Sequence, residues 1–231
     1  TNENSPLRVL RNRPILSDIS MARGLQMAQY TVGKFDREKG QNKMQEMAVK
    51  TKVNGIQVDR LFETIDAIKE TPGLADFKFR LRNRWMNGAV NRSTVKNFYG
   101  TKQEHQHEPA FVLDSDEPKI LLGGETSVNP VEYLLHALIA CVTTALVYHA
   151  AAKGIELQEI ESRVEGKIDL RGFLGLDDSV RRGYQNIQIK FRIKADVPDD
   201  QLEEIVRLGP TYSPVFDSIT RGVNVDVSLD K

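Results

Sequence analysis

The sequence contains one cysteine, Cys141, within the stretch NPVEYLLHALIACVTT of residues 129–144. A thiolate is a strong nucleophile and a metal ligand, whereas a protonated thiol in apolar surroundings is inert. Among Leu, Ile, Ala and Val, a cysteine most often acts as a small core side chain. The residue therefore allows two interpretations, a core side chain or a reactive thiol, and its surroundings must decide between them.

The residues around this cysteine predict one long helix over residues 130–153. Asn129 is suited to the N-cap, a proline follows in the first turn, and Glu132 can reach back to the cap's amide. Gly154 suits a left-handed stop. The helix is apolar on nearly all sides, which indicates burial at the centre of a domain or between two subunits. One sheet face cannot bury such a helix completely, so we expect a homodimer formed through it.

The place of Cys141 in this helix limits how the thiol could be activated. It lies about three turns from the N-terminus, beyond the reach of the helix dipole. Glu132 falls nearly opposite it and about 13 Å away along the axis. Activation would therefore need another strand, the C-terminal helices or a partner subunit. Residues that share its helix face are Leu134, Ala137, Ala145 and Tyr148.

A two-residue period outside this helix predicts antiparallel strands. FKFRLR alternates from Phe77, and Asn87-Gly88 suits a tight hairpin turn into a second strand over residues 91–99. Three later segments alternate more strictly: SRVEGKIDLR at 162–171, NIQIKFRIKA at 186–195 and VNVDVSL at 223–229. Further helices are expected over residues 199–208 and from Pro214. This order predicts the α+β class, with helices stacked on one antiparallel sheet that has one wet face.

The first 75 residues differ from the rest. They suggest a helix over residues 18–30 and a short strand pair around VKTKVNGIQV. A clearer helix follows, with Asp59 as N-cap and TPG at residues 71–73 as its stop; its apolar stripe is Leu61, Phe62, Ile65 and Ile68. We interpret residues 1–75 as an N-terminal helical extension of a main domain over residues 76–231. A partly disordered arm is the alternative.

The overall composition excludes several classes of partner. The 231 residues include 32 basic and 32 acidic ones, so neither nucleic acid nor an anionic membrane surface is an expected partner. A single cysteine rules out a disulfide within the chain, which makes a reducing, cytoplasmic setting the default. No apolar run reaches the roughly 18 residues that span a bilayer, and the first 30 residues lack the pattern of a signal peptide.

The helix motif NPVEYLLHALIAC, read together with SPVFDSI at 213–219, resembles the OsmC/Ohr family of organic hydroperoxide reductases. That family carries an N-P-x-E-L-like helix start, a cysteine in mid-helix and a later Cys-Pro-Val. The resemblance spans roughly residues 77–229 and is to a subgroup with an N-terminal extension and no second cysteine. It implies a stress-response protein that forms an intertwined homodimer, with the two cysteine-bearing helices at its centre and the active site at the subunit interface.

The resemblance also implies roles for single residues. Cys141 matches the peroxidatic cysteine, whose thiolate attacks the distal oxygen of a hydroperoxide and becomes a sulfenic acid. Ser213 stands where the family has its second cysteine, so an external thiol would be the reductant, with no cofactor. Val131 stands where catalytic members have a glutamate that orients an arginine, and Glu132 follows one position later. Arg84 and Arg92 flank the first hairpin, the family's neighbourhood for that arginine; Arg171 and Arg182 are weaker candidates.

The substrate implied by the resemblance is a small apolar hydroperoxide. The residues expected to line its pocket are Leu134, Leu138, Tyr148 and Phe216. An alternative from another class is a non-catalytic dimer of the same fold that binds a small apolar ligand at the subunit interface, with Cys141 as part of the lining. Ser213 and Val131 both favour this alternative.

The remaining polar motifs favour structural roles. HQHEP, which begins at His105, has two imidazoles but no third ligand at a recognisable spacing, so we expect a polar loop and no metal. His136 and His149 point away from the cysteine's helix face and are interpreted as core or interface histidines. Gly123-Gly124 lacks the lysine of a phosphate loop and is interpreted as a turn.

Overall fold

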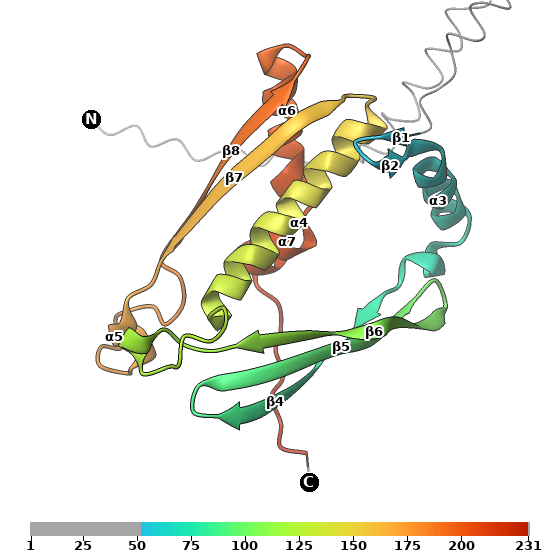
Figure 1. Cartoon of the computed structure of the whole chain (residues 1–231). Helices are drawn as coiled ribbons and strands as arrows, with labels where there is room; N and C mark the ends of the chain where they lie inside the picture. The colour runs from blue at the N-terminus through green and yellow to red at the C-terminus, as the bar shows by residue number, and fades with distance from the viewer. Residues whose placement is uncertain (1–51, 231) are drawn as a thin grey trace, which may run out of the picture. The chain divides into compact units, whose positions relative to one another are not determined.

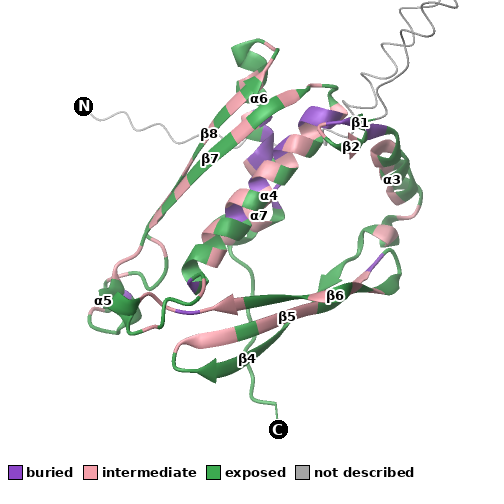
Figure 2. Cartoon of the chain, viewed as in Figure 1, coloured by how far each residue is buried: buried purple, intermediate pink, exposed green. Residues whose placement is uncertain are grey.

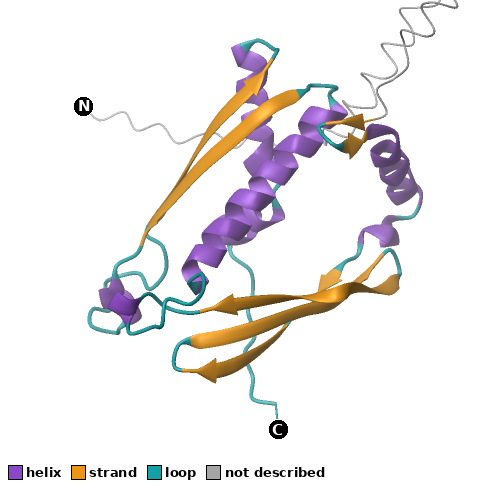
Figure 3. Cartoon of the chain, viewed as in Figure 1, coloured by secondary structure: helices purple, strands orange, loops and turns teal. Residues whose placement is uncertain are grey.

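The computed structural model describes residues 52–230, which fall within one compact unit of the chain, residues 52–231. The helix predicted over residues 18–30 lies outside the described residues. The fold is α+β, as the sequence predicts: Figures 1 and 3 show antiparallel strands together with one long helix and several shorter ones. Two larger sheets and one small one replace the single sheet that we expected, because alternation identifies a strand but not its partner.

The first larger sheet has four strands: β3 (Lys78–Phe79), β4 (Arg82–Asn87), β5 (Val90–Gly100) and β6 (Gln103–Ser115). β5 pairs with the other three, always antiparallel. The predicted hairpin turn is confirmed, since Gly88 has a φ of 55°, which glycine adopts without a steric penalty. The predicted hairpin is therefore present, but its first strand, which we expected to continue from Phe77, is divided into β3 and β4.

The segment HQHEP is part of β6, so the loop that we predicted there is wrong. His105 lies opposite Phe98 of β5, and the two rings stack with centroids 4.9 Å apart. His107 also stacks on Phe98, at 5.3 Å. Cross-strand ring contacts of this kind stabilise a strand whose sequence looks polar.

The second larger sheet is the pair β7 (Leu157–Lys167) and β8 (Asn186–Ala195). β8 has the predicted bounds, and its residues alternate strictly between half-buried and exposed. β7 starts five residues before the predicted segment and ends at Lys167. Leu170, which we expected inside a strand, begins the short helix α5 (Leu170–Phe173), because Asp169 caps that helix by accepting from the Arg171 amide at 3.0 Å.

The core lies between α4 (Pro130–Ala152), α6 (Asp199–Tyr212) and the β7–β8 sheet. Leu146 and Ala150 of α4 and Ile205 of α6 are its fully buried centre. Figure 2 shows the buried residues gathered along α4 and the helix packed on it. α6 runs past the predicted end at Leu208 despite Pro210, and in its last turn the Thr211 hydroxyl donates to the Arg207 carbonyl at 2.7 Å. The helix α7 (Pro214–Arg221) starts where the sequence predicts.

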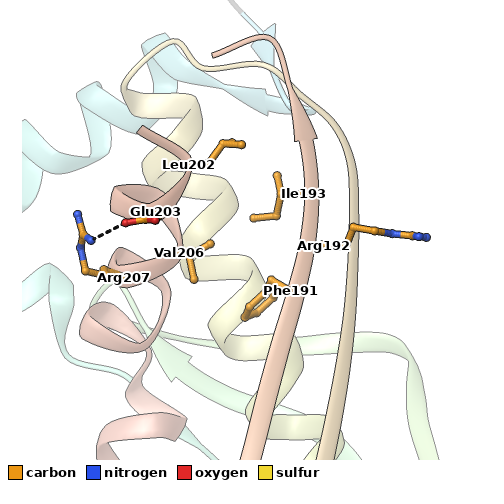
Figure 4. A pocket seen from close by; sticks show the side chains of 7 residues that line it. All are labelled: Phe191, Arg192, Ile193, Leu202, Glu203, Val206 and Arg207. Carbon is orange, nitrogen blue, oxygen red and sulfur yellow. Dashed lines mark ion pairs between the residues drawn. The ribbon is translucent and has the colours of Figure 1, made fainter. Parts of the chain in front are cut away.

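A groove with a volume of about 550 Å³ lies between β8 and α6. Figure 4 shows Phe191 and Ile193 pointing from β8 toward Leu202 and Val206 of α6, while Arg192 points away from the groove. Phe191, Ile193 and Val206 also pack against the core, so the groove borders it.

The described chain begins with the strand pair β1 (Lys52–Val53) and β2 (Ile56–Gln57), the helix α3 (Val58–Glu70) and the short 3-10 helix η1 (Pro72–Ala75). α3 starts one residue before Asp59, so Gln57 occupies the cap position and the predicted cap is wrong. Asn54, at the turn of the strand pair, donates to the Ile155 carbonyl and accepts from the Leu157 amide, both at 2.8 Å. This side chain ties the strand pair to the start of β7.

The predicted strand VNVDVSL is not formed: residues 222–230 have no regular structure. Its four apolar side chains are between 66% and 90% exposed. The segment has the alternating apolar and polar residues of a strand, but no strand among residues 52–230 pairs with it.

Within the described residues, α4 is long and apolar enough to cross a membrane by length and composition. Our expectation that no segment meets this criterion is therefore wrong. Glu132 and the two histidines interrupt the apolar run of α4, but the mean hydropathy of the helix still meets the criterion. The core helix of a globular protein meets the same criterion, and α4 carries part of the core described above.

Candidate functional site around Cys141

Cys141 lies on the side of α4 that the rest of the described chain leaves open. Its side chain is half-buried, and its helix-face neighbours Leu134 and Tyr148 are 40% and 44% exposed. The buried residues form a stripe centred about 120° around the helix from the cysteine: Leu138, Val142, Leu146 and Ala150. The structure therefore keeps Leu134 and Tyr148 beside the cysteine, as the sequence predicts, and places Leu138 in the core.

A close helix contact fixes the rotation of α4 at the cysteine. A Cβ atom on Gly209 of α6 would lie 3.0 Å from both Val142 Cγ1 and the Val142 carbonyl oxygen. α6 therefore touches the α4 backbone at the residue that follows Cys141. Since consecutive helix residues are separated by about 100°, this contact directs the cysteine away from α6. The sequence contains the signal, a glycine inside a helix, but does not reveal its partner.

The carboxylate of Glu132 is engaged in the predicted capping box. Its Oε2 accepts from the Asn129 amide at 3.0 Å, and Asn129 Oδ1 accepts from the amides of Val131 and Glu132. The Tyr184 hydroxyl donates to the Val131 carbonyl at 2.8 Å. Burial, together with the negative charge of Glu132, raises the pKa of Tyr184. Glu132 thus has a structural role at the helix start, about three turns from the cysteine.

Arg92 is held by an aspartate of the next strand. Its guanidinium forms two hydrogen bonds with Asp114, at 2.7 and 2.8 Å. This hydrogen bonding lowers the pKa of the Asp114 carboxyl and raises that of Arg92. Tyr133 of α4 donates to the Asp114 carbonyl at 2.8 Å, so the same residue ties the four-stranded sheet to the first turn of α4.

Arg84 lies opposite Arg92 in the β4–β5 register and is exposed. Within residues 52–230 it makes no ion pair, and Cys141 makes no hydrogen bond or ion pair with either arginine. Of the weaker candidates, Arg171 is bound to Asp169 at 2.6 Å and Arg182 to Asp178 at 3.4 Å. Among residues 52–230 no hydrogen bond or ion pair therefore joins a cationic side chain to the cysteine.

Ser213 is 1% exposed and caps α7 by accepting from the Phe216 amide at 3.1 Å. Ser213 therefore has a structural role at the start of α7. Phe216 is half-buried. A hydroxyl at this position cannot form a disulfide, so among the described residues Cys141 has no second thiol to react with.

The two histidines of α4 differ in their surroundings. His149 stacks on Tyr212 with ring centroids 4.4 Å apart, and burial, helped by the charge of Lys153, lowers its pKa, which favours neutral imidazole. His136 is exposed. Within residues 52–230 no group of three His, Cys, Asp or Glu side chains could hold a metal ion.

The fold is α+β, and the cysteine lies on its long central helix. A model of the OsmC-like protein family matches residues 123–228, so this part of the chain is an OsmC-like domain. No curated protein matches the sequence.

Several solved structures are similar. An OsmC-like protein from Mycoplasma pneumoniae is 16% identical, with a TM-score of 0.48 over 63% of this chain and 89% of that one. An organic hydroperoxide resistance protein OsmC from Legionella pneumophila is 15% identical, with a TM-score of 0.46 over 64% of this chain and 92% of that one. The organic hydroperoxide resistance protein OhrB of Bacillus subtilis is 19% identical, with a TM-score of 0.40 over 62% and 90%.

Proposed function

We propose that the protein is a stress-response redox protein that reduces small apolar hydroperoxides through Cys141, with an external thiol as reductant. The observation that carries this proposal is the position of the cysteine: it is partly exposed, on the open and apolar side of α4, about 120° around the helix from the centre of the buried stripe. A cysteine that only filled the core would lie with Leu138 and Val142. An apolar approach to the sulfur fits an apolar substrate.

The proposed reaction has two halves. The thiolate of Cys141 attacks the distal oxygen of ROOH, the O–O bond breaks, and ROH leaves after taking up a proton, so that the sulfur becomes a sulfenic acid. One external thiol then condenses with the sulfenic acid, releasing water and forming a mixed disulfide. A second external thiol attacks this disulfide and restores Cys141. The cycle needs no second cysteine in the chain.

The proposal includes a homodimer, because two apolar surfaces of the described chain have no cover. One is the side of α4 around Cys141. The other is the face of the four-stranded sheet that carries a row of stacked rings; its most exposed members are Phe77, Phe79 and Phe111, at 44%, 78% and 57%. Contiguous apolar surface of this kind marks an interaction site. A two-fold partner would cover both surfaces and could bring Arg84 to the sulfur, with residues 76–231 as the dimerising domain and residues 1–75 as its extension.

The second candidate function is a non-catalytic dimer that binds a small apolar ligand beside Cys141. Three observations favour it: Ser213 replaces a second thiol, Glu132 is used by the helix cap, and Arg92 is bound to Asp114. In that case the cysteine lines a pocket and is no more reactive than a free thiol.

Reaction with cumene hydroperoxide distinguishes the two. The protein would be mixed with the hydroperoxide, trapped with dimedone at timed intervals and examined by mass spectrometry, with Cys141→Ser as the control. For the peroxidase we expect the dimedone adduct of Cys141 to form at least about tenfold faster than that of cysteine in a peptide, and dithiothreitol to restore the thiol in a sample that received the hydroperoxide but no dimedone. If Cys141 is modified no faster than cysteine in the peptide, the peroxidase function is contradicted and the ligand-binding function is favoured.

A further inference from the structure

We propose that Asn87 is a site of spontaneous deamidation, a modification that removes its side-chain amide and rearranges the backbone of the β4–β5 turn. The inference is independent of Cys141 and of the proposed function. It starts from the two Asn-Gly pairs of the sequence, Asn54-Gly55 and Asn87-Gly88, each at a turn between two antiparallel strands. The two pairs have the same reacting groups but differ in their hydrogen bonds.

The reaction needs no reagent except water. The backbone nitrogen of the glycine loses its proton and attacks the side-chain carbonyl carbon of the asparagine. The bond from this carbon to Nδ2 then breaks, and the nitrogen leaves as ammonia with that proton. The product is a five-membered succinimide, which water opens at either of its two carbonyls to give aspartate or isoaspartate. Glycine favours the ring closure because it has no side chain to obstruct the attack.

The reacting groups of Asn87 and Gly88 have no competing partners. Both residues are exposed, and within residues 52–230 neither the Asn87 side chain nor the Gly88 amide makes a hydrogen bond. A Cβ atom on Gly88 would meet no other atom within 4 Å, so the space beside the attacking nitrogen is open. The side chain can therefore turn toward the nitrogen without losing a contact.

Asn54, in contrast, is held by two hydrogen bonds. Its Nδ2 donates to the Ile155 carbonyl and its Oδ1 accepts from the Leu157 amide, both at 2.8 Å. Attack by the Gly55 nitrogen would require the side chain to turn and to leave two partly buried backbone groups unpaired, which is costly. Gly55 is as open as Gly88, since a Cβ atom there would also meet nothing within 4 Å. The expected difference in rate therefore comes from the asparagine side chain.

Deamidation of Asn87 would change the hairpin that contains it. Isoaspartate adds a carbon atom to the main chain before Gly88, and both products carry a negative charge. The indole of Trp85, the only tryptophan of the sequence, donates to the Gly88 carbonyl at 2.9 Å, so a longer turn would disrupt this bond. The same hairpin sets Arg84 opposite Arg92, so the modification would also disturb the register of these two arginines.

Tryptic digestion tests both sites in one experiment. Cleavage at the basic residues gives two peptides of equal length, VNGIQVDR from residues 53–60 and WMNGAVNR from residues 85–92. The folded protein would be kept at mildly alkaline pH, sampled over several days, digested and examined by mass spectrometry, with fragmentation to separate Asn87 from Asn91. We expect Asn87 to be converted at least about tenfold faster than Asn54, because only Asn54 must break two hydrogen bonds.

Two controls make the result specific to the fold. In protein unfolded by guanidinium chloride the two rates should converge, because nothing then protects Asn54. Asn87→Gln keeps an amide but forms the required ring much more slowly, so it should abolish the conversion and also the slow change in Trp85 fluorescence that we expect in the wild type. If Asn87 in the folded protein is converted no faster than Asn54, or if Asn54 remains slower after unfolding, the inference is overturned.

Discussion

At the scale of single residues, Asp116 shows how one buried carboxylate organises the approach to α4. It is fully buried and accepts from the Glu117 amide, the Thr126 amide and the Thr126 hydroxyl, at 2.8 to 3.0 Å. The loop that it closes holds the 3-10 helix η2 (Lys119–Leu121) and leads to Asn129, the cap of α4. Sequence reasoning missed this residue, because an aspartate in a polar loop gives no sign that its partners lie ten residues away.

These hydrogen bonds lower the pKa of Asp116 to about 2, with Thr126 as the main cause. Because the folded value is below the unfolded value of about 3.9, the charged carboxylate stabilises the fold above pH 4 and loses this contribution as the pH falls toward 2. Asp116→Asn should therefore lower the free energy of unfolding at pH 7, and its difference from the wild type should shrink between pH 5 and pH 2. Urea unfolding at several pH values measures this; a difference that stays constant with pH would refute it.

At the scale of elements, the contact between α4 and α6 depends on Gly209. An added Cβ would lie 3.0 Å from the Val142 carbonyl oxygen, which belongs to a helix backbone and cannot move cheaply. Gly209→Ala should therefore destabilise the protein by roughly 1–2 kcal/mol, despite the better helix propensity of alanine. Urea denaturation provides the measurement.

The matched control for this substitution is Gly183→Ala. There the new Cβ would meet only the Arg181 Nε atom, at an unstrained 3.9 Å. Its effect should stay within about 0.5 kcal/mol. Equal effects of the two alanines would show that the helices separate easily and that Gly209 does not fix the rotation of α4.

The strand pair β1–β2 depends on Asn54, whose φ of 52° is unusual for a side-chain-bearing residue. Asn54→Gly keeps this backbone conformation and removes both hydrogen bonds to the start of β7, so it should cost roughly 1–3 kcal/mol. Asn54→Ala should cost about 1 kcal/mol more, because alanine is strained at positive φ. Hydrogen exchange should rise in residues 52–70 of both variants; unchanged exchange there would mean that the side chain does not hold the pair.

The elements that were predicted correctly are those whose own sequence contains the signals that define a helix or a strand. The central helix has a capping box and a stop signal within its sequence, and the alternation of β8 is uninterrupted. β6 was missed because its polar residues pair with β5 and its histidines stack on Phe98, and both are contacts between strands. The strand at residues 223–229 was predicted from alternation alone, which cannot supply a partner. For the same reason sequence located Cys141 but not the Arg92–Asp114 pair, which only strand register brings together.

At the scale of the whole molecule, the open side of α4 is the surface through which we propose that two copies associate. If two copies meet there, Leu134 of each copy loses its exposure, and a charge at this position must be buried without a partner. Leu134→Glu should therefore raise the dimer dissociation constant at least about tenfold, which corresponds to roughly 1.4 kcal/mol. Sedimentation velocity over a concentration series measures this shift.

The control is Gln158→Glu, an exposed position on β7. It introduces the same charge elsewhere and should leave the dissociation constant unchanged. Should both variants dimerise like the wild type, the interface would not include the side of α4 that carries Cys141, and the sulfur would have to react without a partner subunit.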